Sequence, residues 1–215
     1  MLGGKCPDCQ SKIGITYPVV EILTGLLFVA TVWSFGLSIQ TLFYLILFSG
    51  LIAITFIDLE HLIIPNVITY PGIGIGIIYG ALRTNWEQSA EIIGNFSFGF
   101  LSFFQLLREI PLLDSIFGIL IGGGILLLIA YTYEIIKKRQ GMGIGDVKLL
   151  AMIGAFFGWE GVLFVLFLGA ILGSVVGITI IISQKGDMQK AIPFGPFLSI
   201  ATVVYAFTGG FEMFV

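Results

Sequence analysis

The chain has 215 residues, of which 57% are hydrophobic and only 11% are charged, and its mean hydropathy is +1.06. This composition is more apolar than a soluble domain needs to bury its core, so it indicates a membrane protein. The formal net charge of -3 and the lack of a basic tract interleaved with aromatic residues argue against nucleic-acid binding.

Transmembrane helices are expected because several apolar runs approach the roughly 20 residues with which an α-helix crosses a hydrocarbon core. The alternating pattern of membrane strands is absent from the sequence. The sequence therefore predicts an all-α polytopic membrane protein, a bundle of about seven transmembrane helices. The predicted spans are residues 18–36, 40–57, 64–82, 115–136, 147–159, 161–183 and 192–211.

The first predicted unit is a short cytoplasmic segment, residues 1–17, which carries Cys6 and Cys9 and precedes a membrane-embedded domain over residues 18–215. One Cys-x-x-Cys pair supplies two of the four thiolates that a closed tetrahedral zinc site requires. We therefore expect two reduced thiols, or at most a partial zinc site.

The orientation follows from the ten Lys and Arg residues, which accumulate in cytoplasmic loops. With a cytoplasmic amino terminus, seven spans leave only Arg83 and Arg108 outside and place the carboxy terminus outside. An eighth span at residues 89–113 would move the basic cluster 137–139 outside, so this stretch is expected to be interfacial or re-entrant on the outer face. The predicted location is the inner (plasma) membrane.

Glycines in two predicted spans recur every fourth residue, which lines one helix face with small residues and allows another helix to approach closely. We expect these glycines to serve helix packing and assign them no chemistry. They are Gly72, Gly76 and Gly80 in the third span and Gly169, Gly173 and Gly177 in the sixth.

Two aspartates lie at the edges of predicted spans, where an ionisable group is costly and is by default a functional candidate. Asp58 ends the second span and Asp146 opens the fifth, so the topology places both carboxyls at one depth on the cytoplasmic side. Two carboxyls that share a site cannot both ionise cheaply, and one keeps a proton while the other acts as a base. Such a pair can activate water against a peptide bond without a metal.

We expect the residues around these acids to form an active-site or substrate-binding loop. Gly143 and Gly145 precede Asp146 and lack a Cβ that would obstruct a substrate strand, although a flexible glycine loop before a helix acid has the same pattern. Glu60 lies two residues after Asp58, where the second predicted span ends. Lys148 is expected to point to a different helix face from Asp146 and to extend to the interface.

Residues 143–146 spell Gly-x-Gly-Asp, a motif of membrane aspartyl proteases, and the wider context resembles the bacterial type IV prepilin leader peptidases. The resemblance spans Lys5 to Ala201 apart from residues 82–114, and it implies that Asp58 and Asp146 cleave the basic leader from pilin-like precursors after a glycine on the cytoplasmic side. The precursors and the lipid bilayer are the expected partners, and proteolysis is expected to need no cofactor. The matching blocks are KCPDCQSKIGITYPVVEILTGLLF, IDLEHLIIPN, GMGIGDVKLLAMIGAFFGW and IPFGPFLSIA.

The sequence departs from this family at its start, where many members have a further span and two Cys-x-x-Cys pairs. Only Cys6 and Cys9 are present here. The resemblance also implies methylation of the new amino terminus, and S-adenosylmethionine is expected as a cofactor only if that activity is retained.

Two other functions fit paired acids in a membrane. A presenilin-like intramembrane protease is expected to have Tyr-Asp and Pro-Ala-Leu motifs, whereas this chain has Ile57, Asp58 and a Pro-Phe-Gly-Pro loop. A proton- or cation-coupled transporter usually binds its cargo near the midplane between internal repeats, and neither feature is evident in the sequence.

Overall fold

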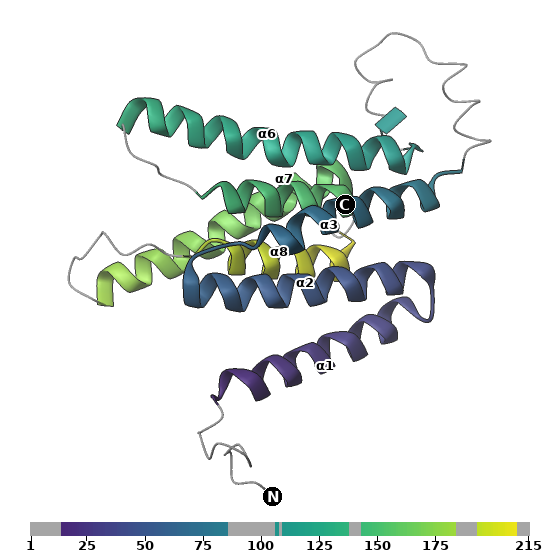
Figure 1. The fold of residues 1–215 in the computed structure, drawn as a ribbon, viewed down its shortest axis with the longest axis horizontal. Coiled ribbons are helices and arrows are strands. Elements are labelled where there is room, and N and C mark those ends of the chain that lie inside the picture. The colour runs from purple at the N-terminus through teal and green to yellow at the C-terminus, as the bar shows by residue number, and fades with distance from the viewer. Residues whose placement is uncertain (1–13, 86–105, 108, 138–142, 184–192, 210–215) are drawn as a thin grey trace, which may run out of the picture. The chain divides into compact units, whose positions relative to one another are not determined.

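The computed structural model describes residues 14–85, 106–107, 109–137, 143–183 and 193–209. In this part of the chain the regular elements are all helices, which confirms the predicted all-α class (Figure 1). The helices are α1 (Thr16–Phe35), α2 (Ile39–His61), α3 (Asn66–Arg83), α6 (Pro111–Lys137), α7 (Ile144–Ser183) and α8 (Gly195–Thr208).

The helices confirm a multi-pass membrane protein. Four of those described, α1, α2, α6 and α7, are long and apolar enough to cross a membrane, and α8 is a shorter apolar helix. Every predicted span coincides with a helical segment, while the number of seven crossings stays a prediction. Cys6, Cys9 and most of the predicted interfacial stretch 89–113 lie outside the described residues.

The chain forms two compact units, residues 1–52 and 53–215. In the first unit, α1 and the start of α2 are joined by a tight turn at Gly36, whose φ of 64° favours glycine. The Gly36 N–H donates to the carbonyl oxygen of Val32 at 2.9 Å, and the Thr41 hydroxyl donates to the Gly36 carbonyl at 2.6 Å. Backbone and hydroxyl groups therefore fix this short connection.

The second unit is organised around α7, which packs against α3, α6 and α8, while α3 also packs against α6. Leu149, Leu150 and Ile153 of α7 and Leu198 of α8 are completely buried. Burying side chains of this size in close packing fixes the helices relative to one another. The start of α7, which carries Asp146, is thus held in the interior of the unit.

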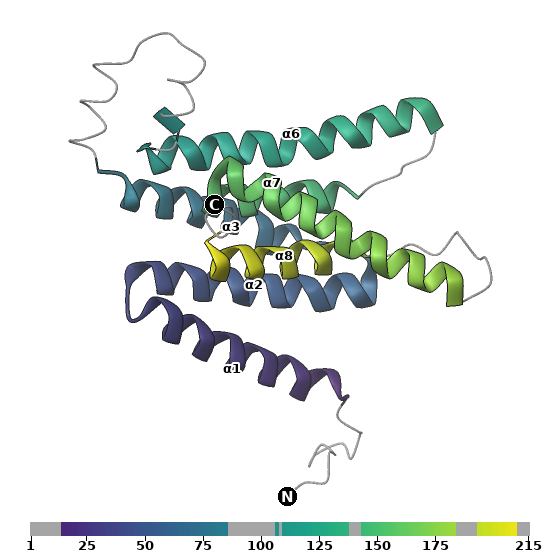
Figure 2. The same cartoon turned by 180° about the vertical axis from the view of Figure 1, so that it is seen from behind.

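A break at Gly158 divides α7 into two helices, because this glycine has the non-helical angles φ 67° and ψ -167°. The second half runs back towards the end at which the first half begins (Figures 1 and 2). The sequence predicts two spans here with a boundary near residue 160, and the structure places the turn at Gly158. The first half is short, about 20 Å for 13 or 14 residues.

The predicted packing role of the spaced glycines is confirmed where the structure describes their contacts. A Cβ on Gly72 would overlap Met152, one on Gly76 would overlap Ala155, and one on Gly80 would overlap Ser115. Glycines 169 and 173 of α7 similarly contact residues 198 and 197 of α8. The contacts of Gly72 and Gly76 let α3 approach the first half of α7 closely.

Candidate active site

Asp58 lies in the last turn of α2, where the chain reverses towards α3. The helix ends at His61, and Leu62 takes a left-handed conformation with φ 55°. The Leu62 N–H donates to the Asp58 carbonyl oxygen at 2.9 Å, which closes the helix end. A left-handed leucine costs about 1 kcal/mol or more, and such local strain is concentrated at functional sites.

The Asp58 side chain is buried, with 5% of its surface exposed. Its Oδ2 accepts a hydrogen bond of 3.0 Å from the backbone N–H of Gly195, the first residue of α8. The first N–H groups of a helix have no partner within the helix, so this carboxyl satisfies one of them. A Cβ at residue 195 would lie 2.7 Å from the same oxygen, which explains the glycine.

Asp146 lies in the first turn of α7. Its backbone N–H donates to the Gly143 carbonyl oxygen at 3.2 Å, so the glycine loop turns directly into the helix. Gly145 packs against Ile64, and a Cβ there would lie 2.8 Å from the Ile64 Cβ. Gly145 therefore allows the α2–α3 connection to approach α7, a role in addition to the open substrate path expected from sequence.

The two aspartates face one cavity of about 300 Å³ at this end of the second unit. Both predicted acids therefore line the same cavity, and their action as a catalytic pair stays a prediction. Other residues that line the cavity include Leu62, Asn66, Gly143 and Lys148.

The two remaining loop candidates are placed differently. Glu60 is exposed and approaches only His61, at 4.0 Å, and it does not line the cavity. Lys148 lines the cavity, and its ammonium is directed towards α3. Its Nζ donates to Asn66 Oδ1 at 2.8 Å and lies 5.3 Å from the centre of the Tyr70 ring.

Sequence reasoning missed Asn66 and the Gly195 amide as parts of this site. Asn66 follows Pro65 at the start of α3, and Gly195 stands in the Pro-Phe-Gly-Pro loop. The available signal was position, because both residues begin helices at the end of the bundle that carries the aspartates.

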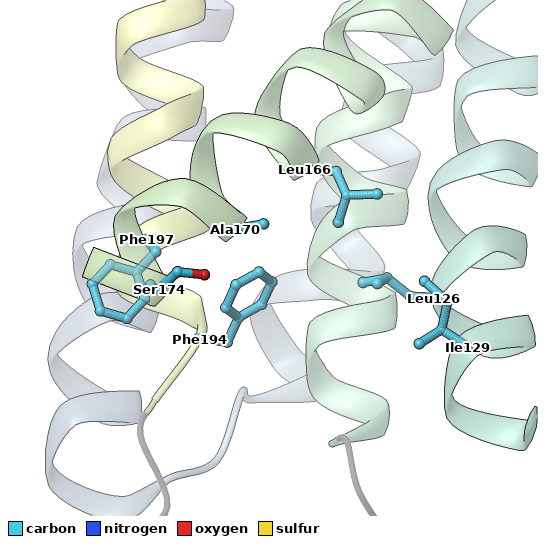
Figure 3. Close-up of a pocket in the computed structure, with 8 residues that line it drawn as sticks. Leu126, Ile129, Leu166, Ala170, Ser174, Phe194 and Phe197 are labelled. Atoms are coloured by element: carbon cyan, nitrogen blue, oxygen red, sulfur yellow. The ribbon is translucent and has the colours of Figure 1, made fainter. Parts of the chain in front are cut away.

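A second cavity, of about 480 Å³, lies between α6, the second half of α7 and the start of α8 (Figure 3). Its lining is apolar except for the Ser174 hydroxyl and includes Leu126, Ile129, Phe194 and Phe197. With no titratable side chain in its lining, this cavity has no acid–base chemistry of its own. The acid-lined cavity is therefore the candidate active site.

No group of three or more His, Cys, Asp or Glu residues that could hold a metal ion occurs in the described part of the chain. Cys6 and Cys9 lie outside that part, so the structure says nothing about the partial zinc site considered from the sequence.

Fold and site together define a polytopic helical membrane protein in which two helix-end aspartates share one cavity. Residues 45–178 match the Type IV leader peptidase family, and residues 1–35 match the Bacterial Peptidase A24 N-terminal domain. The chain belongs to the type IV leader peptidase family.

Curated relatives named prepilin leader peptidase/N-methyltransferase support this membership. The protein from Aeromonas salmonicida (strain A449) is 34% identical over 93% of this chain and 60% of its own length. The protein from Pseudomonas aeruginosa is 33% identical over 93% of this chain and 61% of its own length. The protein from Neisseria gonorrhoeae is 34% identical over 94% of this chain and 60% of its own length. The chain thus spans about 60% of the length of these relatives. No solved structure matches it.

Proposed function

We propose that this protein is an aspartyl endopeptidase of the inner membrane that cleaves the basic leader from type IV prepilin-like precursors after a glycine, at the cytoplasmic face. The observation that carries the proposal is the shared cavity, into which Asp58 and Asp146 project from the ends of two helices. Family membership and the names of the relatives point to the same reaction.

In the proposed reaction, one carboxylate takes a proton from a bound water, which attacks the carbonyl carbon of the scissile peptide. The other carboxyl, protonated at this stage, donates to the developing oxyanion, and a proton then passes to the leaving amine as the C–N bond breaks. The Gly195 N–H holds Asp58 Oδ2, which leaves Oδ1 to bind the water. Fixing the carboxyl in this way avoids reorganisation during the reaction.

The position of the acids favours this reaction over coupled transport. Both lie where a helix begins or ends, in a cavity whose lining includes loop residues, rather than in the middle of a long helix. A scissile peptide near the membrane surface can reach such a cavity without unfolding inside the bilayer. Methyl transfer with S-adenosylmethionine is not part of the proposal and is tested separately by adding that donor.

The test is cleavage of a purified prepilin-type precursor by the purified full chain in bilayer discs. Asp58→Asn and Asp146→Asn should each lower kcat by at least about a thousandfold, because each variant loses one half of the acid–base pair. Asp114→Asn is the matched control, since it changes a carboxyl of α6 that lies beside the break in α7 and outside the dyad cavity, and it should cleave like the wild type. Retained cleavage in either dyad variant would exclude the proposed mechanism.

A further inference from the structure

Lys148 occupies an unusual position for a cation. It lies in the second turn of α7, close to the positive end of the helix dipole, where acidic side chains are favoured over basic ones. Helix stability therefore does not explain it. Its side chain instead enters the cavity that contains Asp58 and Asp146.

Lys148 nevertheless pairs with neither acid. The ion pair found among the described residues joins His61 and Glu60, and the Lys148 ammonium instead contacts two neutral groups of α3. It donates to Asn66 Oδ1 at 2.8 Å and lies over the Tyr70 ring at 5.3 Å. Both contacts draw the ammonium towards α3, and cation–π attraction adds to the hydrogen bond.

The direction of the Lys148 ammonium matters because the proposed reaction needs one proton shared between two carboxyls. An ammonium within about 4–6 Å of a carboxyl favours the ionised form and typically lowers the pKa of that carboxyl by about one to three. A lysine free to turn towards the dyad would therefore favour the state in which both carboxyls are ionised and no general acid remains.

We propose that Asn66 is a positioning residue, which together with Tyr70 holds the Lys148 ammonium away from the aspartates so that the pair keeps its shared proton. This inference rests on the proposed peptidase function. In this proposal the hydrogen bond between Asn66 and Lys148 controls the charge of the active site, in addition to joining the start of α3 to the start of α7.

The other charged groups near the dyad do not provide an equivalent cation. On α2, Glu60 and His61 are exposed, and on α6, Glu134 is exposed. The titratable side chain of α8 is Tyr205, about 15 Å along the helix from Gly195. Among the described residues, Lys148 is the cation that lines the dyad cavity.

The test compares Asn66→Ala, Lys148→Met and the double variant Asn66→Ala/Lys148→Met in the cleavage assay, across a range of pH. Asn66→Ala should move the alkaline limb of the kcat/KM profile about one unit lower, so that activity above that limb falls about tenfold. The Lys148–Asn66 contact is exposed, which places the shift at the lower end of the usual range. The loss should largely disappear at lower pH.

The double variant distinguishes the proposed role of Asn66 from the alternatives. Lys148→Met should lower kcat/KM less than Asn66→Ala does, and adding it to Asn66→Ala should restore the position of the alkaline limb. A simple tie between helices predicts equal losses in all three variants with no shift in the limb. A direct role of Lys148 in substrate binding predicts that the double variant is at least as impaired as Asn66→Ala.

Either of those outcomes would overturn the inference while leaving the dyad intact, because the wild type would still cleave and the Asp58→Asn variant would not. Failure of the wild type to cleave any prepilin-type precursor would instead remove the proposed function itself. Thermal unfolding of each variant in detergent separates damage to the fold from the change in pH dependence.

Discussion

The hydrogen bond between Gly195 and Asp58 decides the position of a single carboxyl. Its donor belongs to the first turn of α8, and the acceptor is a buried side chain from the end of α2. A hydrogen bond to a charged group contributes about 1.5–3 kcal/mol. The same close approach leaves no room for a Cβ at residue 195.

Gly195→Ala should therefore displace Asp58 and lower kcat/KM about ten- to hundredfold, the kinetic equivalent of that interaction energy. Cleavage kinetics of the purified variant measure the effect. Gly74→Ala is the matched control, because a Cβ there meets nothing within 4 Å, and it should cleave like the wild type. Unchanged kinetics in Gly195→Ala would show that the carboxyl does not depend on this contact.

At this scale the sequence predicts the acids but not their partners. Asp58 and Asp146 stand out because an acid at the edge of an apolar span needs an explanation. Gly195 and Asn66 are separated from the residues they contact by 137 and 82 positions. Such pairings depend on tertiary packing, which no local pattern encodes.

At the scale of the helix, the break in α7 is held by a residue of another helix. Asp114 in the first turn of α6 accepts a hydrogen bond of 3.2 Å on Oδ1 from the Trp159 N–H. Its carboxylate also packs directly on Gly158. Asp114 thus caps the second half of α7 from outside.

Asp114→Ala should destabilise the protein by about 1 kcal/mol, the usual cost of removing a helix cap. The reason is that the Trp159 N–H loses its acceptor. Asp114→Asn keeps a side-chain oxygen and should lose less. Thermal unfolding in one detergent compares the two variants, and equal melting temperatures for the wild type and Asp114→Ala would contradict the capping role.

The predicted spans 147–159 and 161–183 place a boundary within α7, and the structure has a break there. The sequence does not identify Gly158 as the residue with positive φ, because other glycines in the same helix, such as Gly154 and Gly161, lie within four residues. Gly158 differs from these other glycines because Asp114 occupies the space that a side chain at residue 158 would need.

At the scale of the whole molecule, contacts between α3 and α6 bear on the topology. The Leu112 N–H donates to the Thr84 hydroxyl at 3.0 Å, and Gly80 packs against Ser115. The end of α3 and the start of α6 therefore lie together, at the opposite end of α3 from Asn66.

This arrangement predicts the accessibility of the two ends of α3, a helix of 18 residues or about 27 Å. Val67 and Asn85 flank its length and are exposed, and single cysteines at these positions can be introduced after Cys6 and Cys9 are replaced by serine. With the dyad facing the cytoplasm, a membrane-impermeant maleimide should label Asn85→Cys in intact cells and Val67→Cys only after permeabilisation. The cysteine-free chain, which should remain unlabelled and active, is the control. The reverse pattern would place Asp58 and Asp146 on the outer face, where a basic leader retained in the cytoplasm cannot reach them, so this labelling tests the orientation on which the proposed cleavage depends.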